Sequence, residues 1–306
     1  MSRGLDLDLP HEHSRHRDDG GGHEMPRGGR GAGSDRPRER EALSPRDALA
    51  QQLDLPCGDG REQFQIRERS CHLRGSEVRT LAAIGAFRIV DARDLGSDRE
   101  LAHLKESGLV EIRSAQFRDG ERTAVVTLTK DGKELLEKHQ WPRHTEPRQE
   151  FYSGLAKPRE ASHDAQLYRA YEKAATRLQA GGARIHRVVI DYELKRDYQR
   201  FLQAHNRGNR HASGKPDRSR EEIQEWVRKH DLPMVGDHVQ FPNVRIEYEG
   251  SDGRDRHEDV ELTTEHYNSR QMGAKRSSGF TMHRGGSSQG RGSSPFDPHA
   301  AEKVLR

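Results

Sequence analysis

Ser76-Glu-Val-Arg-Thr-Leu-Ala-Ala-Ile-Gly opens the stretch that decides the fold, which continues to Gln140. The apolar residues of this segment recur at the spacing of one helix face, at Val78, Leu81, Ala82 and Gly85. Ser76 is a residue type that caps helices, so the sequence predicts a helix that begins there. A short extended piece, Ala86–Val90, and a second, very short helix, Asp91–Gly96, are predicted to follow.

A third helix and a β-hairpin complete this stretch. Ser97 is the expected N-cap of a helix over Asp98–Ser107, and Gly108 ends that helix. The pattern then predicts two strands around a tight turn and a closing helix, at Leu109–Gln116, Ala124–Leu128 and from Thr129 onward. A helix presented beside a basic hairpin is typical of a winged helix-turn-helix domain, which reads a DNA groove and holds the flanking phosphates.

The third helix and the hairpin carry side chains suited to DNA. Leu101 and Leu104 are expected to face the core, which leaves the other faces of the helix to solvent. The predicted DNA-binding residues, whose donors suit base edges and phosphates, are Arg99, His103, Lys105, Arg113, Arg118 and Arg122. Nearby acidic residues dilute the positive field, at Asp98, Glu100, Glu106, Asp119 and Glu121. A small domain whose hairpin docks protein instead of DNA is the alternative.

Two motifs of this stretch resemble the winged-helix regulators of the multiple-antibiotic-resistance (MarR) type. They are Leu104-Lys-Glu-Ser-Gly-Leu-Val-Glu-Ile-Arg and Val126-Thr-Leu-Thr-Lys-Asp-Gly-Lys-Glu-Leu-Leu. The resemblance implies the end of a recognition helix, a wing and a closing helix. It covers about sixty-five residues and is more specific for the fold than for repression. The chain has no flanking heptads of the kind that dimerise such regulators, so obligate dimerisation is not expected.

Composition limits the class of protein. Of the 306 residues 30% are hydrophobic and 34% are charged, and the mean hydropathy is −1.10. Such a chain is too polar for one compact body, so unstructured segments are expected. Cys57 and Cys71 are too few for a zinc ribbon and are expected to be reduced thiols. No apolar run reaches membrane length, and we expect a cytoplasmic protein that does not bind membranes.

The expected fold class is α+β, with a winged helix followed by a small α/β domain and disordered ends. Residues 1–60 are rich in Gly, Arg, Asp and Pro and are expected to form a disordered arm. The winged helix is expected over 61–141, a polar linker over 142–161, the second domain over 162–284 and a disordered tail over 285–306.

The second domain alternates between helical and strand patterns. Helices are predicted from His163 to Gly181, over Tyr192–Gln203 and over Glu221–His230, and a buried strand over Ile185–Asp191. Val244–Tyr248 and Asp259–Thr263 are predicted to pair as strands across a polar turn at Gly250–Arg254.

Two carboxylates on the second of these strands could perform chemistry. Strand alternation places Asp259 and Glu261 on one face, where they could share a Mg²⁺ ion that activates water against a phosphodiester. Lys275, on a following helix, would stabilise the developing phosphate charge. The candidate catalytic residues are therefore Asp259, Glu261 and Lys275, the first two also being the candidate metal ligands. The alternative is that both carboxylates belong to the solvated face of an edge hairpin.

The same segment resembles the C-terminal half of replication-relaxation proteins of bacterial mobile elements. The resemblance rests on Phe241-Pro-Asn-Val-Arg-Ile-Glu-Tyr, Asp259-Val-Glu-Leu and Lys275. It implies a winged helix joined to a domain similar to PD-(D/E)xK nucleases. Where that pattern has Pro-Asp, this chain has Pro242-Asn243, and a neutral amide is a poorer ligand for Mg²⁺ than a carboxylate. Cleavage is therefore not expected.

The sequence thus favours a protein that binds double-stranded DNA and needs no cofactor to do so. From the resemblance we expect an accessory or regulatory factor in transfer or replication of a mobile element, with a relaxase or other mobilisation proteins as partners. Its nuclease-like domain is expected to be inactive. The alternatives are an endonuclease that uses Mg²⁺ at Asp259, Glu261 and Lys275, a plain MarR-like repressor, and a scaffold that binds only protein.

Overall fold

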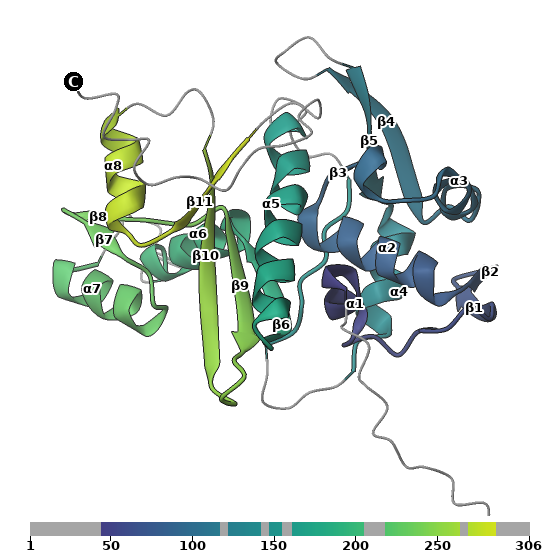
Figure 1. Ribbon diagram of the computed structural model, residues 1–306, viewed down its shortest axis with the longest axis horizontal. Coiled ribbons are helices and arrows are strands. Elements are labelled where there is room, and N and C mark those ends of the chain that lie inside the picture. The colour runs from purple at the N-terminus through teal and green to yellow at the C-terminus, as the bar shows by residue number, and fades with distance from the viewer. Residues whose placement is uncertain are drawn as a thin grey trace, which may run out of the picture. The chain divides into compact units, whose positions relative to one another are not determined.

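The computed structural model describes residues 44–116, 122–141, 147–154, 161–204, 218–263 and 269–285 (Figure 1). All of them belong to one compact unit, residues 41–306. The described structure mixes helices with several sheets, so the α+β class is confirmed at that level. Among the described residues, no helix combines the length and the apolar composition that crossing a bilayer requires.

The stretch from Gly75 to Lys138 forms a three-stranded sheet with helices packed against it. Its elements are α2 (Gly75–Phe87), β3 (Val90–Asp91), the 3₁₀ turn η1 (Ala92–Asp94), α3 (Asp98–Glu106), β4 (Val110–Gln116), β5 (Arg122–Leu128) and α4 (Lys130–Lys138). The strand order is β3-β5-β4, and β4 and β5 are antiparallel. Leu81, Leu104 and Leu128 are fully buried in its core. The predicted helices and strands of this stretch are present in the structure. However, α2 begins at Gly75 after the N-cap residue Arg74, so Ser76 is not its cap, and α2 includes Ala86 and Phe87, the first two residues of the piece expected to be extended.

The elements before α2 were not predicted. Ser44 caps α1 (Pro45–Ala50) through a reciprocal capping box with Asp47, and Ala48 and Leu49 are buried. A two-stranded hairpin, β1 (Glu62–Ile66) and β2 (Arg69–Leu73), follows. The prediction of a disordered arm is therefore wrong from Ser44 onward, because α1 has an apolar face that packs against α2. The earlier residues of that arm lie outside the described residues.

A second sheet, of four strands, is formed by the later part of the chain in the order β11-β10-β9-β6. The elements in chain order are α5 (Ala161–Ala180), β6 (Arg184–Ile190), α6 (Asp191–Leu202), α7 (Arg220–Lys229), β7 (Met234–Val235), β8 (His238–Val239), β9 (Val244–Glu249), β10 (Asp255–Thr263), α8 (Ser269–Ser277) and β11 (Thr281–Arg284). Strands β6, β9 and β10 are antiparallel neighbours, whereas β11 lies parallel to β10. The crossover through α8 makes that parallel pairing feasible.

Helix α5 packs against both sheets (Figure 1). It contacts β3 and β4 as well as β6, β9 and β10. Tyr171 and Ala174 of α5 belong to the same buried cluster as Leu81 of the first sheet region and Ile246 of the second. The ranges expected to form two domains therefore share one hydrophobic core.

Part of the expected linker also belongs to this core. Gln149, Phe151 and Tyr152 are buried. The Gln149 side chain pairs with the edge of β6 as a strand would, since its amide donates to the Val188 carbonyl at 2.9 Å and its carbonyl accepts from the Val188 N–H at 2.9 Å. The prediction of a simple linker is thus wrong for Gln149–Tyr152, because this segment satisfies backbone groups that β6 would otherwise leave unpaired. Residues 142–146 and 155–160 lie outside the described residues.

Candidate functional site

The exposed face of α3 carries two of the predicted DNA-binding residues. Arg99 and Lys105 are exposed, whereas Leu101 and Leu104 point into the core as the spacing predicts. Ser97 occupies the N-cap position. The acidic side chains of Asp98 and Glu106 are also exposed, so the field of this face is mixed rather than strongly positive.

His103, the third predicted residue of α3, is turned toward the protein. Its Nδ1 lies 3.0 Å from Glu77 Oε1, and its Nε2 lies 2.7 Å from Arg61 Nη1. Because a guanidinium only donates, Nε2 must accept, which places the hydrogen on Nδ1 toward Glu77. The Glu77 side chain is 0% exposed, so it needs such donors. His103 therefore belongs to the contact between α3 and α2.

The hairpin contributes Arg113 and Arg122, both of which are exposed. Arg113 pairs with Glu111 on the same strand, its Nη2 lying 2.6 Å from Glu111 Oε2. Such an exposed pair is weak and would yield to a phosphate at little cost. Arg118 lies outside the described residues. Since α3 contacts β4, the basic groups of the helix and the hairpin belong to neighbouring elements.

The predicted catalytic residue Asp259 forms a buried ion pair with Arg245. The Arg245 side chain donates to Asp259 from Nε at 2.7 Å and from Nη2 at 2.9 Å. The same guanidinium donates to the carbonyls of His230 and Asp231, at 2.6 and 2.8 Å, where α7 ends. Asp259 thus holds the arginine that caps a helix, and both of its oxygens are occupied.

Glu261 is fully buried beside Lys275, so the alternative of a solvated strand face is wrong for this residue. The Lys275 ammonium lies 3.2 Å from Glu261 Oε1, and the Asn243 N–H donates to Oε2 at 3.1 Å. Lys275 also donates to the Phe241 carbonyl at 2.5 Å. The Asn243 side-chain oxygen accepts from the Leu262 N–H at 2.8 Å. The fold therefore brings Glu261, Lys275 and Asn243 together.

Each carboxylate of the predicted metal pair thus has its own basic partner. A divalent cation would have to displace the Arg245 guanidinium from Asp259 and the Lys275 ammonium from Glu261. Within the described ranges, no three or more His, Cys, Asp and Glu side chains are grouped so that they could hold a metal ion. The residues present fit two internal ion pairs better than they fit Mg²⁺.

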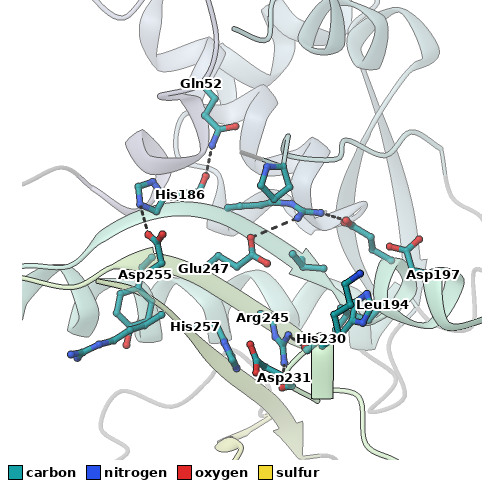
Figure 2. Close-up of a pocket in the computed structure, with 17 residues that line it drawn as sticks. Gln52, His186, Leu194, Asp197, His230, Asp231, Arg245, Glu247, Asp255 and His257 are labelled. Atoms are coloured by element: carbon teal, nitrogen blue, oxygen red, sulfur yellow. Dashed lines mark hydrogen bonds and ion pairs between the residues drawn. The ribbon is translucent and has the colours of Figure 1, made fainter. Parts of the chain in front are cut away.

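A cavity of about 460 Å³ lies over one face of the second sheet, and residues of β6, α6, β9 and β10 contribute to its lining (Figure 2). Strand alternation sends Arg187, Arg245 and Glu247 to this face. Arg187 forms ion pairs with Glu193 of α6 and with Glu247 of β9. The Nε–H of Arg187 is buried and has no hydrogen-bond acceptor among the described residues. Arg187 is thus a cation in the cavity wall whose Nε–H is buried and unpaired among the described residues.

Glu193 gives this cavity a group that titrates near neutral pH. Burial raises its pKa to about 7, although the charge of Arg187 acts in the opposite direction. The Tyr152 hydroxyl donates to Glu193 Oε2 at 3.3 Å. Spacing along the chain gives no sign of this site, because Arg187, Glu193 and Glu247 come from three different elements. A buried carboxyl of this kind can exchange a proton with a bound ligand.

Comparison of the chain with protein-family models, with curated proteins and with solved structures finds no match.

Proposed function

We propose that this chain binds duplex DNA through the outer face of α3 and the β4–β5 hairpin. The observation that carries the proposal is the exposure of Arg99 and Lys105 on a helix that contacts the hairpin bearing Arg113 and Arg122. A helix beside a hairpin can enter a major groove while the hairpin reaches the flanking backbone. The buried leucines of α3 hold it on the core, so the basic side chains are presented by a fixed element.

The charge balance sets the expected character of the binding. Exposed acids beside Arg99 and Lys105 reduce attraction to phosphates in general. Affinity should therefore depend on a modest number of phosphate contacts and on base or shape readout. The resemblance to replication-relaxation proteins supports a role as an accessory or regulatory factor of a mobile element, with a relaxase or another mobilisation protein as the partner.

A second candidate function is Mg²⁺-dependent cleavage of DNA, favoured by the 3.2 Å contact between Lys275 and Glu261. The Arg245–Asp259 pair and the neutral Asn243 argue against it. Asp259 is occupied by a guanidinium that also caps α7, and Asn243 adds no negative charge. We propose that the region around the second sheet acts without hydrolysing DNA.

Fluorescence anisotropy of labelled duplex DNA, titrated at several salt concentrations, tests the DNA-binding proposal. Arg99→Ala and Arg122→Ala should each weaken binding by about three- to tenfold if one hydrogen bond of ordinary net strength is lost. A variant that loses a phosphate contact should also lower the salt slope by about one unit. Arg254→Ala is the matched control, because this arginine is 81% exposed on the β9–β10 turn, away from α3.

The wild-type protein must show salt-dependent binding to duplex DNA for the proposal to stand. Equal affinity and equal salt slope in the wild type and in the Arg99→Ala/Arg122→Ala double variant would place the contact elsewhere. A comparable loss in Arg254→Ala would indicate diffuse charge attraction instead of a defined surface.

A further inference from the structure

The turn that leads into α3 is built around a buried carboxylate. Asp91 is fully buried, and it accepts from the Arg93 N–H at 3.0 Å, from Thr123 Oγ1 at 3.1 Å and from the Arg93 side chain at 2.7 Å. Burial alone would raise the pKa of Asp91, but the Arg93 hydrogen bonds and the charge of Arg169 outweigh it and lower the pKa. The ionised carboxylate is therefore the form that organises η1.

Arg169 of α5, which lies outside the 75–138 region, forms ion pairs with two residues of this turn. Its Nη2 lies 2.8 Å from Asp91 Oδ2, and its Nε lies 2.6 Å from Asp94 Oδ2. One guanidinium thus bridges the residues on either side of Ala92 and Arg93. A lysine would satisfy the two carboxylates less well, because its compact ammonium lacks the planar, forked donors of a guanidinium.

A second arginine, Arg46 of α1, holds the other side of the turn. It donates from Nη1 to the Leu95 carbonyl at 2.9 Å and from Nη2 to the Asp94 carbonyl. Its Nε donates at 2.6 Å to the hydroxyl of Tyr168, which lies next to Arg169 on α5. Two elements outside the DNA-binding stretch therefore fix a turn of three residues.

The turn Ala92–Asp94, which Arg169 and Arg46 hold, lies directly before α3. Leu95, Gly96 and Ser97 separate η1 from α3, and Gly96 has a φ of 96°, a conformation that other residues rarely adopt. Leu95 is buried, so the connection has little freedom. A shift of η1 would consequently move the N-terminal end of α3, where Arg99 lies.

We infer that Arg169 is a positioning residue, which sets the angle at which α3 meets DNA by fixing the turn Ala92–Asp94. The inference rests on the proposed DNA binding and extends it. It gives α5 an indirect role, because α5 would position α3 on the DNA without contacting the DNA itself. Since α5 also packs against the second sheet, the geometry couples that sheet to the presentation of α3.

The variants Arg169→Ala, Arg169→Lys and Arg169→Ala/Asp94→Asn test this role, with Lys173→Ala as the control. Lys173 lies one turn along α5 and is exposed. Hydrogen exchange of the amides from Ala92 to Glu106 reports on the turn and on α3, and thermal melting reports on stability. Anisotropy titrations with labelled duplex DNA at several salt concentrations report on function.

Arg169→Ala should weaken DNA binding by about 2- to 30-fold, with an unchanged salt slope because no phosphate contact is lost. Hydrogen exchange of the amides over Ala92–Glu106 should become faster in Arg169→Ala. Arg169→Lys should have an intermediate DNA affinity and exchange rate, and Lys173→Ala should match the wild type in both. Adding Asp94→Asn removes a half-buried carboxylate that has lost its partner, so it should restore stability without restoring affinity. A merely structural role would restore both together.

Wild-type affinity in Arg169→Ala, in a protein that does bind DNA, would overturn the inference and leave the proposed function standing. A salt slope lowered by about one unit would also overturn it, because Arg169 would then touch the phosphates. If the wild type binds no duplex DNA, the proposed function fails. The claim that Arg169 fixes the turn and α3 is then tested by hydrogen exchange alone. Unchanged exchange of the α3 amides in Arg169→Ala would overturn that claim, and faster exchange would support it.

Discussion

Glu193 shows how one position in the fold changes the chemistry of a side chain. The residue lies in the first turn of α6, where an acidic side chain is ordinary on the surface. Here it is buried between Arg187 and Tyr152, and burial raises its pKa to about 7. The folded protein therefore keeps a proton on this carboxyl at pH values where the unfolded chain has lost it.

The proton on Glu193 predicts a pH dependence of stability. Because the folded pKa of about 7 exceeds the ordinary value of 4.5, unfolding releases this proton between those values, and the free energy of unfolding falls as pH rises through that window. Relative to a Glu193→Gln variant, the wild type should lose about 3 kcal/mol between pH 4.5 and pH 7. Urea unfolding of both proteins at several pH values measures the difference, and parallel curves would contradict it.

The ion pairs at Asp259 and Glu261 predict that no cleavage occurs. The wild-type protein should leave supercoiled and single-stranded DNA intact with Mg²⁺ or Mn²⁺, because both carboxylates are occupied by basic side chains. Asn243→Asp should also be inactive, since Asp259 stays paired with Arg245 in that variant. Agarose gels of plasmid DNA measure nicking. Nicking by the wild type that is lost in Asp259→Ala and in Glu261→Ala would make the chain an endonuclease.

At the scale of elements, local signals account for most helix and strand boundaries. Thr129 accepts from the Gly132 N–H at the start of α4, as its position in the sequence predicts. The β-branched run before Asp191 forms β6, a strand with three buried residues at its end. The hairpin β1–β2 and the short strand β11 were not predicted, because their stability depends on elements packed beside them and not on their own sequence pattern.

Two glycines within helices allow the steric cost of a Gly→Ala substitution to be compared with its gain in helix propensity. A Cβ added to Gly132 of α4 would lie 2.2 Å from the Leu109 carbonyl oxygen, whereas a Cβ at Gly273 of α8 would meet no atom of the described residues within 4 Å. Gly132→Ala should therefore destabilise the fold by about 1–3 kcal/mol. Gly273→Ala should stabilise it by about 0.5–1 kcal/mol, because alanine favours a helix. Thermal melts compare the two, and equal shifts of the same sign would refute the packing argument.

At the scale of the whole molecule, α1 and α5 join elements that are far apart in the sequence. Ala48, Leu49 and Leu53 are buried in the cluster that also holds residues of both sheets. Gln52 donates at 2.6 Å to the His186 carbonyl of β6. The segment once expected to be part of an arm therefore covers the edge of the second sheet.

Two N-terminal deletions should separate the contribution of α1 to stability from that of the residues that precede it. Removal of residues 1–53 takes away α1, Arg46 and several buried apolar side chains, and deletion of a single buried leucine already costs about 2–5 kcal/mol. We expect this variant to melt far below the wild type or not to fold. Removal of residues 1–42 retains the Ser44 cap and α1 and should leave the melting temperature close to that of the wild type. Equal melting temperatures for the two deletions would show that α1 contributes nothing to the core.

The sequence alone determined the local elements, because capping residues, turn glycines and apolar spacing act within a few positions of one another. It placed Leu101 and Leu104 inward, and it assigned Glu261 and Lys275 to one candidate site. It could not assign partners. Asp259 pairs with Arg245, 14 positions away, and Asp91 pairs with Arg169, 78 positions away. Which charges meet, and therefore which carboxylates remain available for chemistry, is decided by how the helices pack on the sheets. A buried ionised carboxylate is stable only where the fold brings it a cationic or hydrogen-bonding partner.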